Sequence, residues 1–285
     1  MTSIIELRQL AISQLAGVSP SPQEDVEQLL CHLLQKPRSY LFTWPDQPLT
    51  AEQQAIFDSY LSQRLQGKPI AYITGTRGFW QFELEVSEAT LIPRPDTEIL
   101  VEQVLAISDA NQPLHVIDLG TGTGAIALAL AYERPNWQIT GVDLLPEAVE
   151  LATRNGKRLG LTNVQFYAGH WFEALPATAG LFDLTVSNPP YIPADDPHLQ
   201  QGDVRFEPKS ALVAGQRGLA AINEIAKNAP DFLKPGGYLF FEHGYDQAAV
   251  VAEMLAGLNY QDIQCKQDLG QNDRITFARL TSPNR

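Results

Sequence analysis

Two short segments combine residue types that suit group-transfer chemistry. The first, Asp118–Gly124, reads D-L-G-T-G-T-G and directly follows an apolar stretch. Glycines at alternate positions let the backbone approach a ligand closely at the start of a helix. Asp143 ends the next predicted strand, where a carboxylate can accept both hydroxyls of a ribose. Together they predict a site for a nucleoside-containing cofactor. The loop also satisfies the loose dinucleotide pattern, so a nicotinamide cofactor and S-adenosylmethionine both remain open on this evidence.

The second segment is Asn188-Pro189-Pro190-Tyr191, which follows a predicted strand ending at the same edge of the sheet. Each proline lacks a backbone N–H and restricts the residue before it to extended geometry. The segment is therefore stiff and rich in acceptors, namely the side-chain carbonyl of Asn188 and the backbone carbonyl of Pro189. The flat ring of Tyr191 adds a surface that can cover a planar group. These features suit a planar –NH2 group aimed at an electrophilic methyl, and they favour methyl transfer over hydride transfer.

Alternating strands and helices position these segments from Pro95 onward. Short apolar strands separated by amphipathic helices are typical of a parallel sheet with helices on both faces. The strands are predicted over residues 114–120, 137–143, 163–169, 181–187, 236–244, 259–266 and 274–280. The predicted fold class is therefore α/β, with a doubly wound and mostly parallel, Rossmann-like sheet.

Helical periodicity dominates the beginning of the chain. Apolar residues recur at helical spacing over residues 3–16. Ser21 with Glu24, and Thr50 with Gln53, have the spacing of capping boxes and predict the starts of two further helices. Next comes a stretch that alternates apolar and polar residues around a glycine-containing turn, which indicates a β-hairpin.

This pattern predicts three parts. Residues 1–70 form a small helical domain, residues 71–90 a β-hairpin linker, and residues 91–285 the domain that binds the cofactor. The small domain is separate from the glycine loop, and we expect it to dock a macromolecular substrate.

Composition excludes several classes of protein. The chain of 285 residues has a net charge of −13, and residues 81–285 account for −12 of it. Such a domain is a poor general binder of nucleic acids, whose phosphates require clustered Lys and Arg. The sequence has no apolar run of membrane-spanning length, and its two cysteines lie far apart. We expect a cytoplasmic protein that binds neither membranes nor nucleic acid and holds no metal.

The pairing of the glycine loop with Asn188–Tyr191 resembles S-adenosylmethionine-dependent amino-methyltransferases. More closely, the chain resembles the release-factor glutamine N5-methyltransferases, the HemK family, in Ile92–Glu98 (I-P-R-P-D-T-E) and Phe206–Leu212 (F-E-P-K-S-A-L). This resemblance implies methylation of the glutamine in the Gly-Gly-Gln motif of peptide chain release factors 1 and 2. The methyl donor would be S-adenosylmethionine, the product S-adenosylhomocysteine, and the enzyme is expected to be a monomer.

The resemblance also implies roles for individual residues. Gly120, Thr121, Gly122, Thr123, Gly124, Asp143, Trp171 and Asn188 would bind the cofactor. Asn188, Pro189, Pro190 and Tyr191 would bind the substrate, and Asn188, Pro189 and Tyr191 would act in catalysis. Two alternatives remain: an adenine N6-methyltransferase of nucleic acids, which shares the N-P-P-Y motif, and a nicotinamide-dependent oxidoreductase, which shares the glycine loop.

Overall fold

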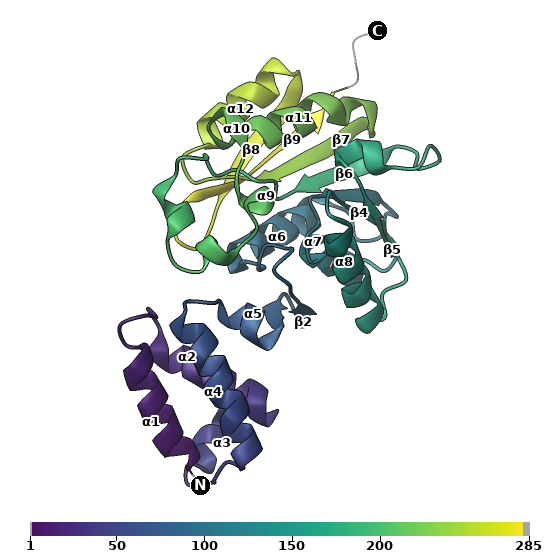
Figure 1. Ribbon diagram of the computed structural model, residues 1–285. Helices are drawn as coiled ribbons and strands as arrows, with labels where there is room; N and C mark the ends of the chain where they lie inside the picture. Colours follow the sequence, from purple (N-terminus) through teal and green to yellow (C-terminus); the bar gives the residue numbers. More distant parts are fainter. Residues whose placement is uncertain (1, 282–285) are drawn as a thin grey trace. The chain divides into compact units, whose positions relative to one another are not determined.

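The computed structural model describes residues 2–281, and this part of the chain divides into two compact units (Figure 1). The helical unit comprises the chain up to Thr76 together with Pro197–Phe206. The α/β unit comprises Arg77–Asp196 and the chain from Glu207 onward. After Asp196 the chain leaves the α/β unit, contributes Pro197–Phe206 to the helical unit, and returns to the α/β unit at Glu207. Sequence periodicity alone does not reveal this connection.

The helical unit is built from amphipathic helices around their own apolar core. Capping boxes start α1 and α4, formed by Ser3 with Glu6 and by Thr50 with Gln53, because each pair satisfies otherwise unpaired backbone N–H groups. The helices are α1 (Ile4–Leu15), α2 (Pro22–Leu34), α3 (Arg38–Thr43), α4 (Ala51–Leu65) and α5 (Ile70–Thr74).

Two local predictions differ from the structure in this region. Ser21 precedes α2 as predicted, but its side chain makes no capping hydrogen bond, so the predicted capping box is wrong. The Ser21 backbone N–H, which a capping box would pair with the Glu24 side chain, donates instead to Ser19 Oγ at 3.0 Å. Helix α5 occupies the beginning of the predicted hairpin linker, and the hairpin itself consists of β1 (Thr76–Phe79) and β2 (Phe82–Glu85).

A buried guanidinium secures Pro197–Phe206 within the helical unit. Arg64, on α4, contacts Asp25 at 2.6 Å and Asp203 at 3.1 Å. It also donates to the backbone carbonyls of Gly67 and Lys68. A buried cation requires such partners, so these contacts hold together segments that are far apart in the sequence.

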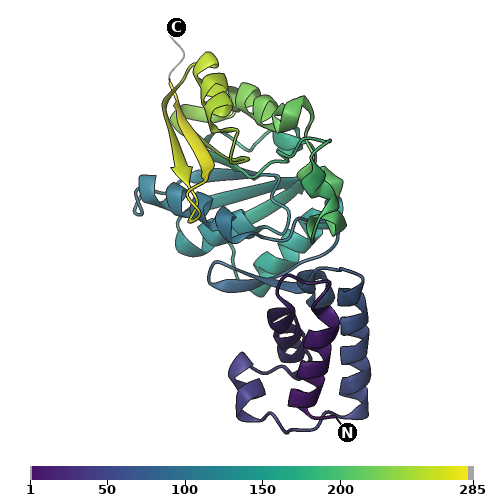
Figure 2. The ribbon, with the colours of Figure 1, turned by 90° about the vertical axis from the view of Figure 1, so that its left-hand side faces the viewer.

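The α/β unit contains a seven-stranded sheet with the order β5-β4-β3-β6-β7-β9-β8. Its first five strands in that order are parallel, and β9 pairs antiparallel with both β7 and β8. Figure 2 shows the last two strands, in yellow, at one edge. The strands are β3 (His115–Leu119), β4 (Gln138–Asp143), β5 (Val164–Ala168), β6 (Phe182–Ser187), β7 (Leu233–Glu242), β8 (Tyr260–Gln267) and β9 (Asp273–Leu280). The predicted α/β fold class is confirmed.

Helices cover both faces of this sheet (Figure 1). Neighbouring strand residues serve opposite faces, so that Val116 belongs to the core beneath α6 and α7, and Ile117 to the core beneath α11 and α12. The helices are α6 (Glu98–Ile107), α7 (Ala125–Glu133), α8 (Pro146–Arg158), α9 (Lys209–Leu212), α10 (Gly215–Gly218), α11 (Ala220–Asn228) and α12 (Ala248–Gly257). Within residues 2–281, no helix is long and apolar enough to cross a membrane.

Strand register brings the two motifs together. Leu119, at the end of β3, pairs with Ser187, at the end of β6, and Ser187 pairs in turn with Phe241 of β7. The residues that follow these strand ends therefore share the carboxyl edge of the sheet, where ligands bind in open α/β folds. A hydrogen bond of 2.6 Å from Ser187 Oγ to the Leu119 carbonyl holds the two ends in place.

Candidate active site

The glycine loop between β3 and α7 adopts a conformation that requires its glycines. Gly120, Gly122 and Gly124 have φ values of 76°, 54° and 84°, in the left-handed region. A Cβ atom on Gly124 would also lie 2.9 Å from the Leu128 side chain. A Cβ on Gly122 would meet nothing within 4 Å, so the space above this part of the loop is open. The loop therefore exposes its backbone to a ligand at the start of α7.

Asp143 and Trp171 lie beside this loop. Asp143 Oδ2 accepts from the Gly122 N–H at 2.9 Å, and its Oδ1 accepts from the Leu145 N–H at 3.0 Å. Burial raises the pKa of Asp143, and these backbone donors oppose the rise. Trp171 has a φ of 43°, unusual for a bulky residue, and places its ring near Gly120. Its indole Nε1 is buried with no hydrogen-bond partner among the described residues.

A second carboxyl group, that of Asp118, supports the loop from below. Asp118 is fully buried, and its Oδ2 accepts from Thr121 Oγ1 at 2.6 Å and from the Ala127 N–H at 3.3 Å. Burial raises the pKa of Asp118 to about 7, although both hydrogen bonds oppose the rise. The glycine loop is therefore hydrogen-bonded to a carboxyl group that gains or loses its proton near neutral pH.

This carboxyl predicts a stability that depends on pH. The folded-state pKa of Asp118 lies above the ordinary value of 3.8, so the folded chain binds the proton more tightly than the unfolded chain. The resulting stabilisation is full below the ordinary pKa of 3.8, declines as pH rises from there, and is lost once pH has risen through about 7. We expect the Tm to fall by on the order of 2–6 °C between about pH 6 and about pH 8.

The isosteric variant Asp118→Asn isolates this contribution from the general charge of the protein. It cannot ionise, so its Tm is expected to change less than that of the wild type over the same pH range. Calorimetric or fluorescence-detected melting measures the difference. A pH dependence identical to that of the wild type would assign the effect to other groups.

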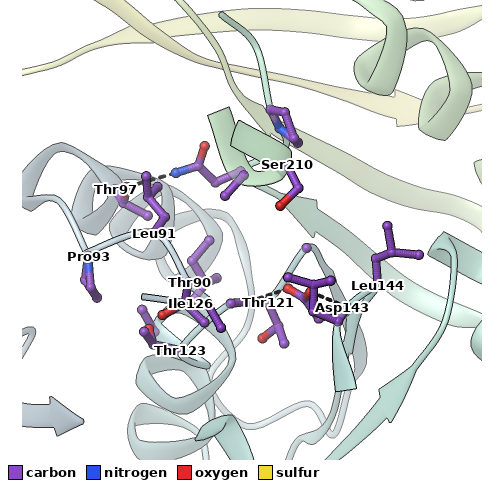
Figure 3. Close-up of a pocket in the computed structure, with 18 of the residues that line it drawn as sticks. Thr90, Leu91, Pro93, Thr97, Thr121, Thr123, Ile126, Asp143, Leu144 and Ser210 are labelled. Atoms are coloured by element: carbon purple, nitrogen blue, oxygen red, sulfur yellow. Dashed lines mark hydrogen bonds between the residues drawn. The ribbon is translucent and has the colours of Figure 1, made fainter. Parts of the chain in front are cut away.

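The Asn-Pro-Pro-Tyr segment follows β6 next to the glycine loop. Asn188 Nδ2 donates to Thr97 Oγ1 at 3.2 Å, the bond drawn as a dashed line at Thr97 in Figure 3. Because its NH2 group is engaged there, Asn188 Oδ1 is the atom left to accept a hydrogen bond from a ligand. Tyr191 donates its hydroxyl to Glu242 Oε1 at 3.3 Å, and burial raises the pKa of Tyr191.

A cavity in the α/β unit joins these features (Figure 3). Eight of the predicted site residues line it: Gly120, Thr121, Gly122, Thr123, Asp143, Trp171, Asn188 and Pro190. In the described chain, Gly124, Pro189 and Tyr191 are not among its lining residues.

Other walls of the cavity come from residues without a predicted role. Thr90, Thr97 and Arg94 line one side, and Ser210 and Ala211 line another. These residues belong to or adjoin Ile92–Glu98 and Phe206–Leu212, the two segments that resemble the family most closely. That resemblance is the only feature of the sequence that points to them. No periodicity or spacing pairs the two segments.

An ion pair joins those two segments beside the cavity. Arg94 Nη2 lies 2.7 Å from both carboxylate oxygens of Glu207, whose side chain is buried. A charge-assisted contact of this kind holds the loop before α6 against the chain that leads into α9. The two walls of the cavity are thereby fixed relative to each other.

The cavity suits a nucleoside ligand that carries an amino-acid tail. The open space above Gly122 lets a ligand reach the loop backbone. The carboxylate of Asp143 offers two acceptor oxygens. The Trp171 ring offers a flat surface, and its Nε1 is a donor without a partner among the described residues. In the described part of the chain, no group of three or more His, Cys, Asp or Glu side chains is arranged to hold a metal ion.

The fold and the site define a methyltransferase, and comparisons with known proteins agree. Residues 110–277 match a family described as a methyltransferase domain, and residues 6–75 match one described as the PrmC N-terminal domain. The crystal structure of a methyltransferase from Pyrococcus furiosus aligns with a TM-score of 0.54 at 19% identity, covering 82% of this chain and all of that one. At this identity the likeness concerns the fold alone.

Curated relatives identify the family. The release factor glutamine methyltransferase of Vibrio cholerae is 54% identical over 92% of this chain and 91% of its own length. The protein of that name from Escherichia coli K12 is 48% identical over 94% and 96%, respectively. The chain belongs to the release factor glutamine methyltransferase family. The resemblance seen in the sequence is confirmed, and the nicotinamide-dependent alternative is not supported.

Proposed function

We propose that this protein transfers a methyl group from S-adenosylmethionine to the side-chain amide nitrogen, N5, of the glutamine in the Gly-Gly-Gln motif of peptide chain release factors 1 and 2. The S–CH3 bond of the sulfonium breaks as the N–CH3 bond forms, so the other products are S-adenosylhomocysteine and the proton that the amide nitrogen releases, and no metal takes part. The observation that carries this proposal is the position of Asn188: its NH2 group is engaged by Thr97, and it lines the same cavity as the glycine loop.

The residues of the motif have distinct tasks in this proposal. Asn188 Oδ1, which lines the cavity, accepts a hydrogen bond from one N–H group of the substrate amide. The Pro189 carbonyl is assigned the second N–H group and the Tyr191 ring the plane of the amide, although neither residue lines the cavity in the described chain. An amide nitrogen is a weak nucleophile, so these acceptors assist by stabilising the positive charge that develops on it. Bound S-adenosylmethionine supplies the electrophilic methyl group. The protein contributes alignment, which removes much of the orientational entropy cost of the reaction.

The cofactor-binding residues follow from the same cavity. The backbone of Gly120–Gly124 holds the methionine part, Asp143 accepts the ribose hydroxyls, and Trp171 packs at the adenine region. Asp143 already accepts two backbone N–H groups, and each of its oxygens retains a further lone pair for a ribose hydroxyl.

Mass spectrometry of release factor incubated with this protein and S-adenosylmethionine tests the proposal directly. We expect one added methyl group, located on the glutamine of the Gly-Gly-Gln motif. DNA containing adenine serves as the competing substrate, because the alternative nucleic-acid methyltransferase would label it instead. A release factor whose motif glutamine is replaced by glutamate is the matched control and should remain unlabelled.

We further propose that the helical unit docks the release factor. Trp44, at the end of α3, has 56% of its surface exposed, and Phe42 is also largely exposed beside Arg8. Exposed aromatic residues next to a cation are typical of binding hot spots. Trp44→Ala is expected to raise the KM for intact release factor about five- to thirtyfold.

The same variant should methylate a short Gly-Gly-Gln peptide as the wild type does, since such a peptide has no surface to dock. Steady-state kinetics with both substrates measure the contrast. Equal losses with peptide and protein would argue against docking at Trp44. The cytoplasmic location and the monomeric state remain predictions from the sequence.

A further inference from the structure

Asn155 is a buried carboxamide on α8, on the side of this helix that packs against the glycine loop. Only 1% of its surface is exposed. Ala152 occupies the same face one turn earlier, and a Cβ added to Gly124 of the loop would lie 3.2 Å from the Ala152 Cβ. Asn155 is not itself among the described residues that line the cavity. It therefore acts on a ligand through the backbone that it contacts.

Each polar atom of this carboxamide has a backbone partner. Asn155 Oδ1 accepts the Glu85 N–H at 2.8 Å, and Nδ2 donates to the Glu85 carbonyl at 3.0 Å. Nδ2 also donates to the Thr123 carbonyl at 3.0 Å. The acceptor and both N–H groups of the side chain are thus engaged, which fixes its orientation. Asn155 thereby joins β2 of the hairpin to the glycine loop, which lie 70 and 32 positions away in the sequence.

The Thr123 carbonyl accepts this bond where a regular helix would supply a different donor. In an α-helix, the N–H group four residues later donates to each carbonyl. Here that group, the Ala127 N–H, donates to Asp118 Oδ2 at 3.3 Å. The Asn155 side chain provides a donor in its place. Thr123, labelled in Figure 3, lines the cavity, so the bond to Asn155 fixes a peptide group in the cavity wall.

The hairpin end of this connection is attached to the same helix. Arg154 and Arg158, which flank Asn155 on α8, lie 3.4 Å and 3.2 Å from the Glu85 carboxylate. Both arginine side chains are largely exposed, and ion pairs of this kind contribute little to stability. The buried bonds of Asn155 are therefore the stronger attachment between Glu85 and α8.

We propose that Asn155 is a positioning residue for the cofactor, which holds the glycine loop in its binding conformation and couples that loop to the β1–β2 hairpin. This inference rests on the proposed role of the loop in binding S-adenosylmethionine. Without the carboxamide, the Thr123 carbonyl and both polar backbone groups of Glu85 lose buried partners. The peptide group after Thr123 can then rotate, which disturbs the loop backbone that faces the ligand. Because coupling between two sites is reciprocal, cofactor binding should also stabilise the hairpin.

Asn155→Ala in the full-length protein tests the effect on the cofactor. We expect its Kd for S-adenosylhomocysteine, measured by calorimetry, to rise about tenfold. The KM for S-adenosylmethionine should rise by a similar factor. The kcat at saturating cofactor and the KM for release factor should stay within about twofold of the wild type, because the defect concerns cofactor binding and not the chemical step. A Kd within about twofold of the wild-type value would overturn the proposal.

Asn163 provides a matched control for loss of stability. Its Nδ2 donates to three backbone carbonyls, those of Ala131, Arg134 and Trp137, at 3.1–3.2 Å. It directly precedes β5 and so lies at the edge of the sheet opposite the cavity. Asn163→Ala and Asn155→Ala should both lower the Tm, by on the order of 2–6 °C, but Asn163→Ala should bind S-adenosylhomocysteine as the wild type does. Equal losses of affinity would assign the effect to general destabilisation and overturn the proposal.

Hydrogen exchange in the wild-type protein tests the coupling without a substitution. Exchange of the Glu85 N–H, measured by NMR, should slow about threefold or more when S-adenosylhomocysteine binds. Asn155→Asp retains the size of the side chain and an acceptor oxygen but lacks both Nδ2 donors, so this response should disappear. Exchange at Glu85 that does not respond to the ligand in the wild type would overturn the proposal. Failure of the wild type to bind S-adenosylhomocysteine at all would instead contradict the proposed function, and it would be seen before any variant is made.

Discussion

Replacement of Asn188 by alanine is expected to lower kcat/KM for release factor on the order of 10- to 100-fold, with little change in Tm. Asn188 is partly exposed to the cavity and makes one side-chain hydrogen bond, to Thr97, so its removal leaves the core intact. The substrate amide, however, loses an acceptor in a buried site, which costs about 1–3 kcal/mol. A labelled-methyl assay together with thermal melting measures both quantities.

Controls make this prediction specific. Asn111→Ala, in an exposed loop, makes the same chemical change outside the cavity and should retain wild-type activity. Affinity for S-adenosylhomocysteine reports whether the cofactor site survives in Asn188→Ala. Wild-type turnover by Asn188→Ala would remove this residue from the mechanism.

The second large effect is expected at Gly218, at the end of α10. Its φ is 85°, and an added Cβ would lie 2.0 Å from the Tyr191 carbonyl oxygen. The same carbonyl accepts from Gln247 Nε2 at 3.0 Å, so it has little freedom to move away. Gly218→Ala combines left-handed strain with this collision and should destabilise the fold by about 2–5 kcal/mol. Because the displaced backbone belongs to Tyr191, methylation should fall by more than tenfold.

The control Gly160→Ala separates the cost of left-handed backbone strain from the cost of the collision with the Tyr191 carbonyl. Gly160 has a φ of 69°, but an added Cβ meets nothing within 4 Å. This exposed site therefore reports left-handed strain alone, about 1–2 kcal/mol, and should retain activity. Chemical denaturation of both variants measures the difference. Equal stabilities of the two variants would show that the backbone near Tyr191 yields to the added methyl group.

Local pattern predicted the parts of the site that lie at strand ends. Alternating strands and helices place the glycine loop, Asp143 and Asn188 at one edge of a parallel sheet, and the structure has them there. Four short α-helices were not predicted, α3, α5, α9 and α10, and each contains only four to six residues, too few to show a period. Ser21 is a residue type that favours a helix cap, but its side chain makes no capping hydrogen bond, and this depends on side-chain geometry that residue type does not reveal.

The sequence by itself determined the fold class, the glycine loop, the Asn-Pro-Pro-Tyr segment and the family, because these depend on residue types at short spacing. The tertiary structure alone decided that Thr97 lies beside Asn188, that Arg94 pairs with Glu207, and that Glu242 is buried beneath the motif. These contacts join residues separated by 51 to 113 positions. Periodicity carries no information over such distances, and burial, which gives Glu242 its raised pKa, exists only once the chain has folded.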